Sequence, residues 1–193
     1  MKPLDALRRM DGLNAERARL YSRFGAAGFA ILAGLIWLKF AVLSPGAEPL
    51  GGDFVSFYAA GKLVLSGHAA DAWRPALHAA AEDGLFHGAH GYLAFFYPPP
   101  YLLVCTPFAL LPYGWAALIW MAATTMLGLW AVRAALNRRL SFAALLAFPA
   151  IWIDIGCGQN GALSLAILSA GFALMPRRPI LGGLVLGCMV IKP

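Results

Sequence analysis

The sequence LAFFYPPPYLLVCTPFALLP, residues 93–112, decides how this chain is arranged. The segment is apolar but contains five prolines, three of them consecutive. Successive prolines lack backbone donors and cannot continue a regular helix. Non-helical backbone at membrane depth is tolerated only where it is buried in protein or lines a cavity. We therefore predict a re-entrant or interfacial segment over 93–113, with a full crossing of the membrane as the alternative.

The sequence around this segment is almost free of charge. No Asp, Glu, Lys or Arg lies between Asp83 and Arg133, and only Asp154 lies between Arg139 and Arg177. The whole chain is 61% hydrophobic and 12% charged, whereas a soluble domain is about 25% charged. These values exclude an ordinary cytosolic enzyme, a nucleic-acid-binding domain and a disordered chain. They predict an all-α polytopic integral membrane protein.

The apolar runs give the expected membrane spans. The first run, 24–43, has the length of a spanning helix and exceeds the apolar core of a signal peptide, so we expect an uncleaved anchor. Further spans are expected after the proline-rich segment, within 114–193, at about 115–135, 140–156, 160–176 and 179–193.

The charges outside the spans predict the orientation. Residues 1–23 carry six basic and three acidic residues, whereas residues 44–113 carry two basic and five acidic ones. If 93–113 does not cross, the later basic clusters at 133–139 and 177–178 fall on the side of the N-terminus, as the positive-inside rule requires. We expect a plasma (inner) membrane protein with a cytoplasmic N-terminus over 1–23 and an extracytoplasmic loop over 44–92.

The extracytoplasmic loop contains the first candidate catalytic residue. Its apolar positions have helical spacing over 54–65, which predicts an amphipathic helix on the membrane surface. A second amphipathic helix is expected over 71–83, with Pro75 in its first turn. Asp53 precedes the first helix. It is either a simple N-cap that accepts backbone N–H bonds, or a general base or substrate clamp at the membrane boundary.

Other polar and small residues allow a structural and a functional interpretation. Asp154 is either a functional carboxylate or a solvated one near the interface. Gln159 and Asn160 either bind sugar or phosphate or form a turn between spans. The histidines indicate a solvated loop rather than a metal site. The three cysteines are expected to be small buried packing residues, and Gly183 and Gly187 form a GxxxG pair that is expected to pack helices.

Several short motifs follow one another in a recognisable order. They are GDFVSFYAAG at 52–61, Gly67, FYPP at 96–99, PFALLP at 107–112, Trp120, GQN at 158–160, Gly182/Gly183 and IKP at 191–193. In this order they resemble glycosyltransferase family 87, a family of GT-C integral membrane glycosyltransferases, over about residues 24–193. The family commonly has Tyr-Asp after the glycine at 67, where this chain has Trp73-Arg74-Pro75.

The resemblance implies a function at the membrane surface. It implies a GT-C hexosyltransferase or related enzyme that transfers a mannose-like or arabinose-like sugar from a polyprenyl-phosphate donor in the bilayer to an extracytoplasmic glycan or glycolipid. Neither a cofactor, a divalent metal nor a nucleic acid is implied. Asp53 maps to the presumed catalytic base. The residues expected to bind substrate are Tyr58, Lys62, Tyr97, Gln159, Asn160 and Lys192, with Lys192 first among the cations available for the phosphate.

Two further expectations concern length and class. Members of the family are longer, with further spans after the Lys-Pro motif, so we expect an N-terminal fragment whose acceptor pocket lies beyond residue 193. The alternative class is a non-enzymatic membrane protein, such as half of a transporter or an assembly subunit. Transporters place charges at mid-membrane, whereas here the informative polar residues gather at one interface, which favours an enzyme acting on a lipid head group.

Overall fold

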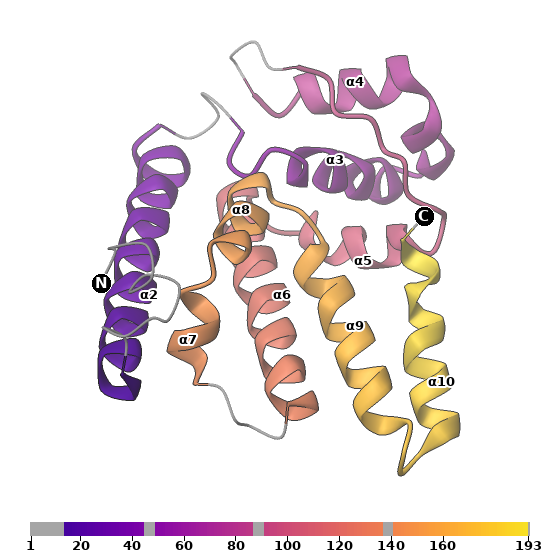
Figure 1. The fold of residues 1–193 in the computed structure, drawn as a ribbon. Helices are drawn as coiled ribbons and strands as arrows, with labels where there is room; N and C mark the ends of the chain where they lie inside the picture. The colour runs from indigo at the N-terminus through magenta and orange to yellow at the C-terminus, as the bar shows by residue number, and fades with distance from the viewer. Residues whose placement is uncertain (1–13, 45–48, 87–90, 137–140, 193) are drawn as a thin grey trace, which may run out of the picture.

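The computed structural model describes residues 14–44, 49–86, 91–136 and 141–192 (Figure 1). The protein is 76% helix, and no strand occurs in the described residues, which confirms the all-α prediction. Two helices are long and apolar enough to cross a membrane, at Ala15–Leu43 and Tyr113–Ala135. The first consists of α2, Ala15–Trp37, which continues as a π-helix over Leu38–Leu43.

The helices form an upright bundle with a layer across one end (Figure 1). The bundle contains α2, α6 (Tyr113–Ala135), α9 (Gly161–Leu174) and α10 (Pro179–Gly187), with α7 (Phe142–Leu146) and α8 (Pro149–Cys157) between α2 and α6. The layer contains α3 (Phe54–Leu65), a 3-10 turn (Ala69–Trp73), α4 (Pro75–Asp83) and α5 (Tyr101–Phe108). A second 3-10 turn, Cys188–Ile191, returns the chain from α10 to this layer.

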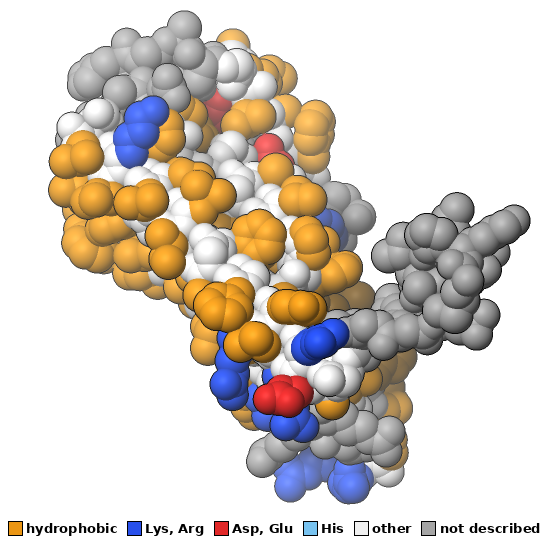
Figure 2. All heavy atoms as spheres, turned by 60° about the vertical axis from the view of Figure 1, so that its left-hand side comes forward, with side chains coloured by type: hydrophobic (Ala, Val, Ile, Leu, Met, Phe, Trp, Pro, Cys, Tyr) orange, Lys and Arg blue, Asp and Glu red, His pale blue; other side chains and the backbone are white. Residues whose placement is uncertain are grey.

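Basic residues gather at the end of the bundle that lies away from the layer. The start of α2, the end of α6 and the junction of α9 with α10 all lie there (Figure 1). These ends carry Arg17, Arg133 and Arg177. Figure 2 shows blue side chains at this end of the face that carries α2, below a broad hydrophobic surface. The bundle therefore has one basic end and one end covered by the layer of short helices.

The helix within the proline-rich segment is too short to cross a bilayer. Its first part has no regular secondary structure, and helix begins only after the three prolines, with Pro100 at the N-cap position of α5. At 1.5 Å per residue, the eight residues of α5 span about 12 Å, far less than the hydrocarbon core of about 30 Å. Instead α5 packs along α3 inside the layer.

Helix α3 differs from the amphipathic surface helix that was expected. Every residue from Phe54 to Gly61 is buried, because α5 covers one side while α4 and the 3-10 turn cover another. A Cβ on Gly61 would lie 2.8 Å from the carbonyl oxygen of Cys105, so glycine permits this close approach. Aromatic side chains from the layer and from α6 complete the core, with Phe54 stacked on Trp120 at 5.8 Å and Phe57 edge-on to Tyr101 at 5.1 Å.

The second helix of the loop is interrupted and holds a buried histidine. Helix α4 begins at Pro75 rather than at 71. His78 is fully buried, so the prediction of solvated histidines was wrong for this residue; His87 and His90 lie outside the described residues. The Nε2 of His78 donates to the carbonyl oxygen of Ser56 at 3.1 Å, and burial lowers the pKa of the His78 imidazole. Glu82 Oε2 accepts from Leu93 N–H at 3.1 Å. These bonds tie α4 to α3 and to the segment that precedes the prolines.

The expectations for the small residues of the bundle were partly wrong. Cys105 is buried as expected, but Cys157 and Cys188 are exposed. A Cβ added to Gly183 or Gly187 would meet no atom within 4 Å, so this pair does not pack against a described helix. The close helix contact of α10 lies at the neighbouring glycine instead.

Exchange of Gly182 for Leu is expected to destabilise the packing of α10 on α9. A Cβ at this position would lie 2.9 Å from the carbonyl oxygen of Gly171 and 3.0 Å from Met175 N. Overpacking of this kind costs about 1–3 kcal/mol, so the melting temperature in detergent should fall. Gly183→Leu is the matched control and should leave it unchanged. Equal melting temperatures for the two variants would contradict this helix register.

Candidate functional site

Two backbone segments that are far apart in the sequence meet beneath the layer. Asp53 N–H donates to the carbonyl oxygen of Cys157 at 2.8 Å. Gly51 and Gly158 both have positive φ angles, 72° and 65°, and a Cβ on Gly158 would overlap the Gly51 carbonyl. Trp120 of α6 donates its indole N–H to the carbonyl oxygen of Gly158 at 3.3 Å. The start of α3 is thereby fixed against the turn that joins α8 to α9.

This junction places the Asp53 carboxylate beside the amide of Gln159. Gln159 Nε2 donates to Asp53 Oδ2. Asp53 occupies the N-cap position of α3, but its side chain accepts no backbone N–H there, unlike the simple cap that was one of the two interpretations. Partial burial raises the pKa of this carboxyl, and the charge of Lys192 opposes the rise. The carboxylate is thus held by a side-chain amide and does not cap the start of α3.

A lysine near the C-terminal end of the described chain also lies close to Asp53. Lys192 follows the 3-10 turn after α10, and its Nζ donates to Asn160 Oδ1 at 2.6 Å. Asn160 itself is buried, with 1% of its surface exposed. The Lys192 ammonium also lies 5.9 Å from the centre of the Tyr97 ring. A fixed positive charge therefore lies near Asp53, with an amide and an aromatic ring beside it.

Two tyrosines from the proline-rich segment form the wall of the site. Tyr97 stacks on Tyr101 with ring centres 4.3 Å apart, and both rings meet the edge of Phe57. Burial raises the pKa of the Tyr97 hydroxyl, and Asn160 opposes the rise. Burial also raises the pKa of the Tyr101 hydroxyl, so both hydroxyls stay protonated and can donate. Tyr101 was not singled out from the sequence, although a second tyrosine four residues after Tyr97, directly after the prolines, was an available signal.

Not all predicted site residues come together. Tyr58 is buried, and its hydroxyl donates to the Leu111 carbonyl oxygen at 2.7 Å. Lys62 lies near the end of α3, with its ammonium 5.4 Å from the Tyr58 ring centre. The structure thus brings together Asp53, Tyr97, Gln159, Asn160 and Lys192, and places Tyr58 and Lys62 farther along α3.

Asp154 caps the start of α9, directly after the two amide residues of the site. Its carboxylate oxygens accept from Gly161 N–H at 3.0 Å and from Ala162 N–H at 3.1 Å. A carboxylate at a helix N-terminus satisfies unpaired N–H groups and complements the helix dipole. Because the bonded residues directly follow Gln159 and Asn160, this capping fixes the turn that carries both amides.

The chemistry available here is that of a base beside an anion site. A carboxylate with a raised pKa can accept a proton from a hydroxyl, and Lys192 with the amide and phenol donors can bind an anionic group such as a phosphate. Among the described residues, no three His, Cys, Asp or Glu side chains gather as metal ligands would. The expectation of a reaction without a metal stays a prediction.

Comparison with models of known protein families gives a match. The model of glycosyltransferase family 87 matches residues 95–193, just over half of the chain. The matched range includes Tyr97, Gln159, Asn160 and Lys192, whereas Asp53 precedes it. No curated protein and no solved structure matches the chain.

Proposed function

Because the chain belongs to glycosyltransferase family 87, we propose that it transfers a sugar from a polyprenyl-phosphate donor to a hydroxyl of a glycan or glycolipid, with Asp53 as general base. The observation that supports this most directly is the meeting of the Asp53 carboxylate with Lys192 at the turn of Gln159 and Asn160. One group accepts a proton, and the other binds the leaving group.

The proposed reaction is a single displacement at the anomeric carbon. The acceptor hydroxyl oxygen forms a bond to this carbon while its proton passes to the Asp53 carboxylate. The bond between the anomeric carbon and the phosphate oxygen breaks, and the electron pair leaves with the polyprenyl phosphate. Lys192 stabilises the negative charge that develops on this phosphate. A phosphate is a good leaving group, so positive charge matters more here than an acid.

The fold supports a site at the extracytoplasmic surface of the membrane. A lipid donor keeps its tail in the bilayer and its phosphate at the surface. The proposed site lies where the layer of short helices meets the bundle, and the basic residues lie at the opposite end (Figures 1 and 2). The positive-inside rule then places the basic end in the cytoplasm. We propose a multi-pass GT-C enzyme of the plasma (inner) membrane in this orientation.

This orientation predicts opposite results for two reporter fusions. A reporter fused after Leu136, at the basic end of α6, should be active only as a cytoplasmic reporter. A reporter fused after Phe86, in the layer, should be active only as an extracytoplasmic one. Alkaline phosphatase and green fluorescent protein activities measure the two sides. If both fusion points lay on the extracytoplasmic side, the chain would cross the membrane twice between them, and the proline-rich segment would be one of these crossings.

The activity itself is tested with labelled donors. The full-length protein that contains this chain, in nanodiscs, is given polyprenyl-phosphate mannose or polyprenyl-phosphate arabinose that carries a radiolabelled sugar, with an envelope lipid extract as acceptor. Transfer should release one polyprenyl phosphate for each sugar that appears in the product. Donors that stay intact with every acceptor fraction would overturn the proposed function.

A further inference from the structure

The backbone carbonyl of Tyr97 receives its hydrogen bond from a side chain of the layer. A carbonyl in a turn normally accepts from the N–H three residues on, but that residue is Pro100, which has no N–H. The N–H of Tyr101, four residues on, donates to the Pro98 carbonyl oxygen at 2.9 Å instead. The indole N–H of Trp73 supplies the donor and lies 2.8 Å from the Tyr97 carbonyl oxygen. The prolines thus leave this carbonyl to a donor from outside the segment.

Trp73 is itself fixed to the helix that begins after Asp53. It ends the 3-10 turn Ala69–Trp73, which packs on α3. Helix α4 follows this turn and is joined to α3 by the bond from His78 to the Ser56 carbonyl oxygen, at 3.1 Å. The indole therefore connects the proline-rich segment to the same part of the fold that carries the proposed base.

The stretch that precedes the prolines is held at both of its ends. It belongs to no helix or strand, so regular secondary structure does not position it. Leu93 N–H donates to Glu82 Oε2 at 3.1 Å. Between this bond and the indole bond, the buried Phe95 ring lies 5.8 Å from the Trp73 ring and 5.7 Å from the Tyr97 ring. Trp73 therefore acts on Tyr97 through its backbone and through a shared neighbour.

We propose that Trp73, the first residue of the stretch that departs from the family pattern, is a positioning residue of the site. Its indole N–H fixes the backbone at Tyr97 and so holds the phenol near Lys192, whose ammonium lies 5.9 Å from the Tyr97 ring centre. There the phenol can donate to the same anionic group as Lys192. The role in sugar transfer rests on the proposed function, in which that group is the donor phosphate, whereas the placement of Tyr97 does not.

The placement of Tyr97 is tested by fluorine NMR of the full-length protein that contains this chain. Tyr97 is replaced by 3-fluorotyrosine, and the effect of Trp73→Phe on its resonance is measured in detergent micelles. Trp73 is 40% exposed, so phenylalanine can keep the contact with Phe95 and opens no buried cavity. Without the indole donor the ring should no longer keep one position, and its resonance should shift and broaden. An unchanged resonance would overturn the proposal.

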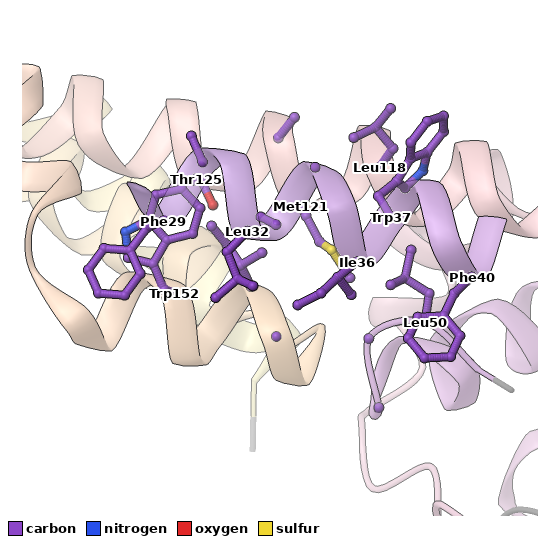
Figure 3. Close-up of a pocket in the computed structure, with 18 of the residues that line it drawn as sticks. Phe29, Leu32, Ile36, Trp37, Phe40, Leu50, Leu118, Met121, Thr125 and Trp152 are labelled. Atoms are coloured by element: carbon purple, nitrogen blue, oxygen red, sulfur yellow. The ribbon is translucent and has the colours of Figure 1, made fainter. Parts of the chain in front are cut away.

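Trp152→Phe is the matched control. The indole N–H of Trp152 donates to the Leu146 carbonyl oxygen at 2.6 Å, and its ring stacks on that of Phe29 with centres 5.4 Å apart (Figure 3). The exchange removes a bond of the same kind, and phenylalanine can keep the stacking. Because this bond joins α7 to α8 and not the layer, the resonance of residue 97 should stay unchanged. An equal shift in both variants would show a general effect on packing and would overturn the role of Trp73.

Donor kinetics test the consequence for the site. Trp73→Phe should raise the KM for a polyprenyl-phosphate sugar about tenfold or more, as for the loss of one hydrogen bond to a charged group. The value of kcat should change little, because the phosphate is anionic before and after the sugar leaves, and a contact made in both states acts on KM. In a Tyr97→Phe background, which lacks the hydroxyl, Trp73→Phe should have almost no further effect. Additive effects of the two exchanges would overturn the proposal, because Trp73 would then act elsewhere.

The two measurements separate this inference from the proposed function. A resonance moved by Trp73→Phe and not by Trp152→Phe, in a protein that transfers no sugar, would uphold the placement of Tyr97 by Trp73 and reject the transferase. Sugar transfer with an unchanged donor KM in Trp73→Phe would overturn the role of Trp73 and leave the transferase standing.

Discussion

Asp53→Asn is expected to lower the rate of sugar transfer by about 100-fold to 10,000-fold, the usual contribution of a general base. The amide has the shape of the carboxylate but cannot take the proton of the acceptor hydroxyl. Its oxygen can still accept the bond from Gln159, and the side chain makes no capping bond to α3. The loss should therefore fall on kcat, with donor binding and melting temperature nearly unchanged. Initial rates with a labelled donor and the purified full-length protein measure the effect.

Asp71→Asn serves as the matched control for this experiment. Asp71 is a carboxylate of the same layer, paired with the exposed Arg74 at 3.2 Å. An ion pair with an exposed partner contributes only about 0–1 kcal/mol, and Asp71 makes no contact with Gln159, Asn160 or Lys192 among the bonds of the site, so this variant should transfer sugar at the normal rate. If Asp53→Asn and Asp71→Asn were equally active, the base would have to be another group.

The sequence was sufficient to predict the helical class and most residues of the site. The motifs that contain Asp53, Gln159, Asn160 and Lys192 were recognised one by one, and the structure brings all four together. Their contacts could not be predicted, because they depend on a backbone junction between segments about a hundred residues apart. The glycines at this junction have no periodic pattern, and their positive φ angles follow from packing.

The burial of α3 was missed for a different physical reason. The spacing of Phe54, Phe57 and Tyr58 indicated one apolar face. The opposite side carries Val55 and Ala59, which are small enough to be buried by a second neighbour. Periodicity detects the contrast between two faces, so it cannot distinguish a surface helix from one covered on both sides when the second face is small and apolar.

Lys192→Met is expected to lower the maximal rate and to shift its pH dependence. The ammonium stabilises the leaving phosphate, and loss of such a group costs about 100-fold to 1,000-fold in rate. It also opposes the raised pKa of Asp53. The base works only when deprotonated, so the rate rises with pH through the pKa of Asp53. Without the cation this pKa moves further up, and the acidic limb of the profile must move to higher pH.

The direction of this shift distinguishes a charge effect from a loss of structure. Values of kcat/KM are measured across the acidic pH range. The acidic limb of this pH profile should lie at higher pH for Lys192→Met than for the wild type. Lys62→Met removes the same charge from α3, where the ammonium lies over the Tyr58 ring and not beside Asp53. Its limb should coincide with that of the wild type. A lower rate for Lys192→Met with an unmoved limb would mean that Lys192 does not act on Asp53, and that the base and the cation do not form one site.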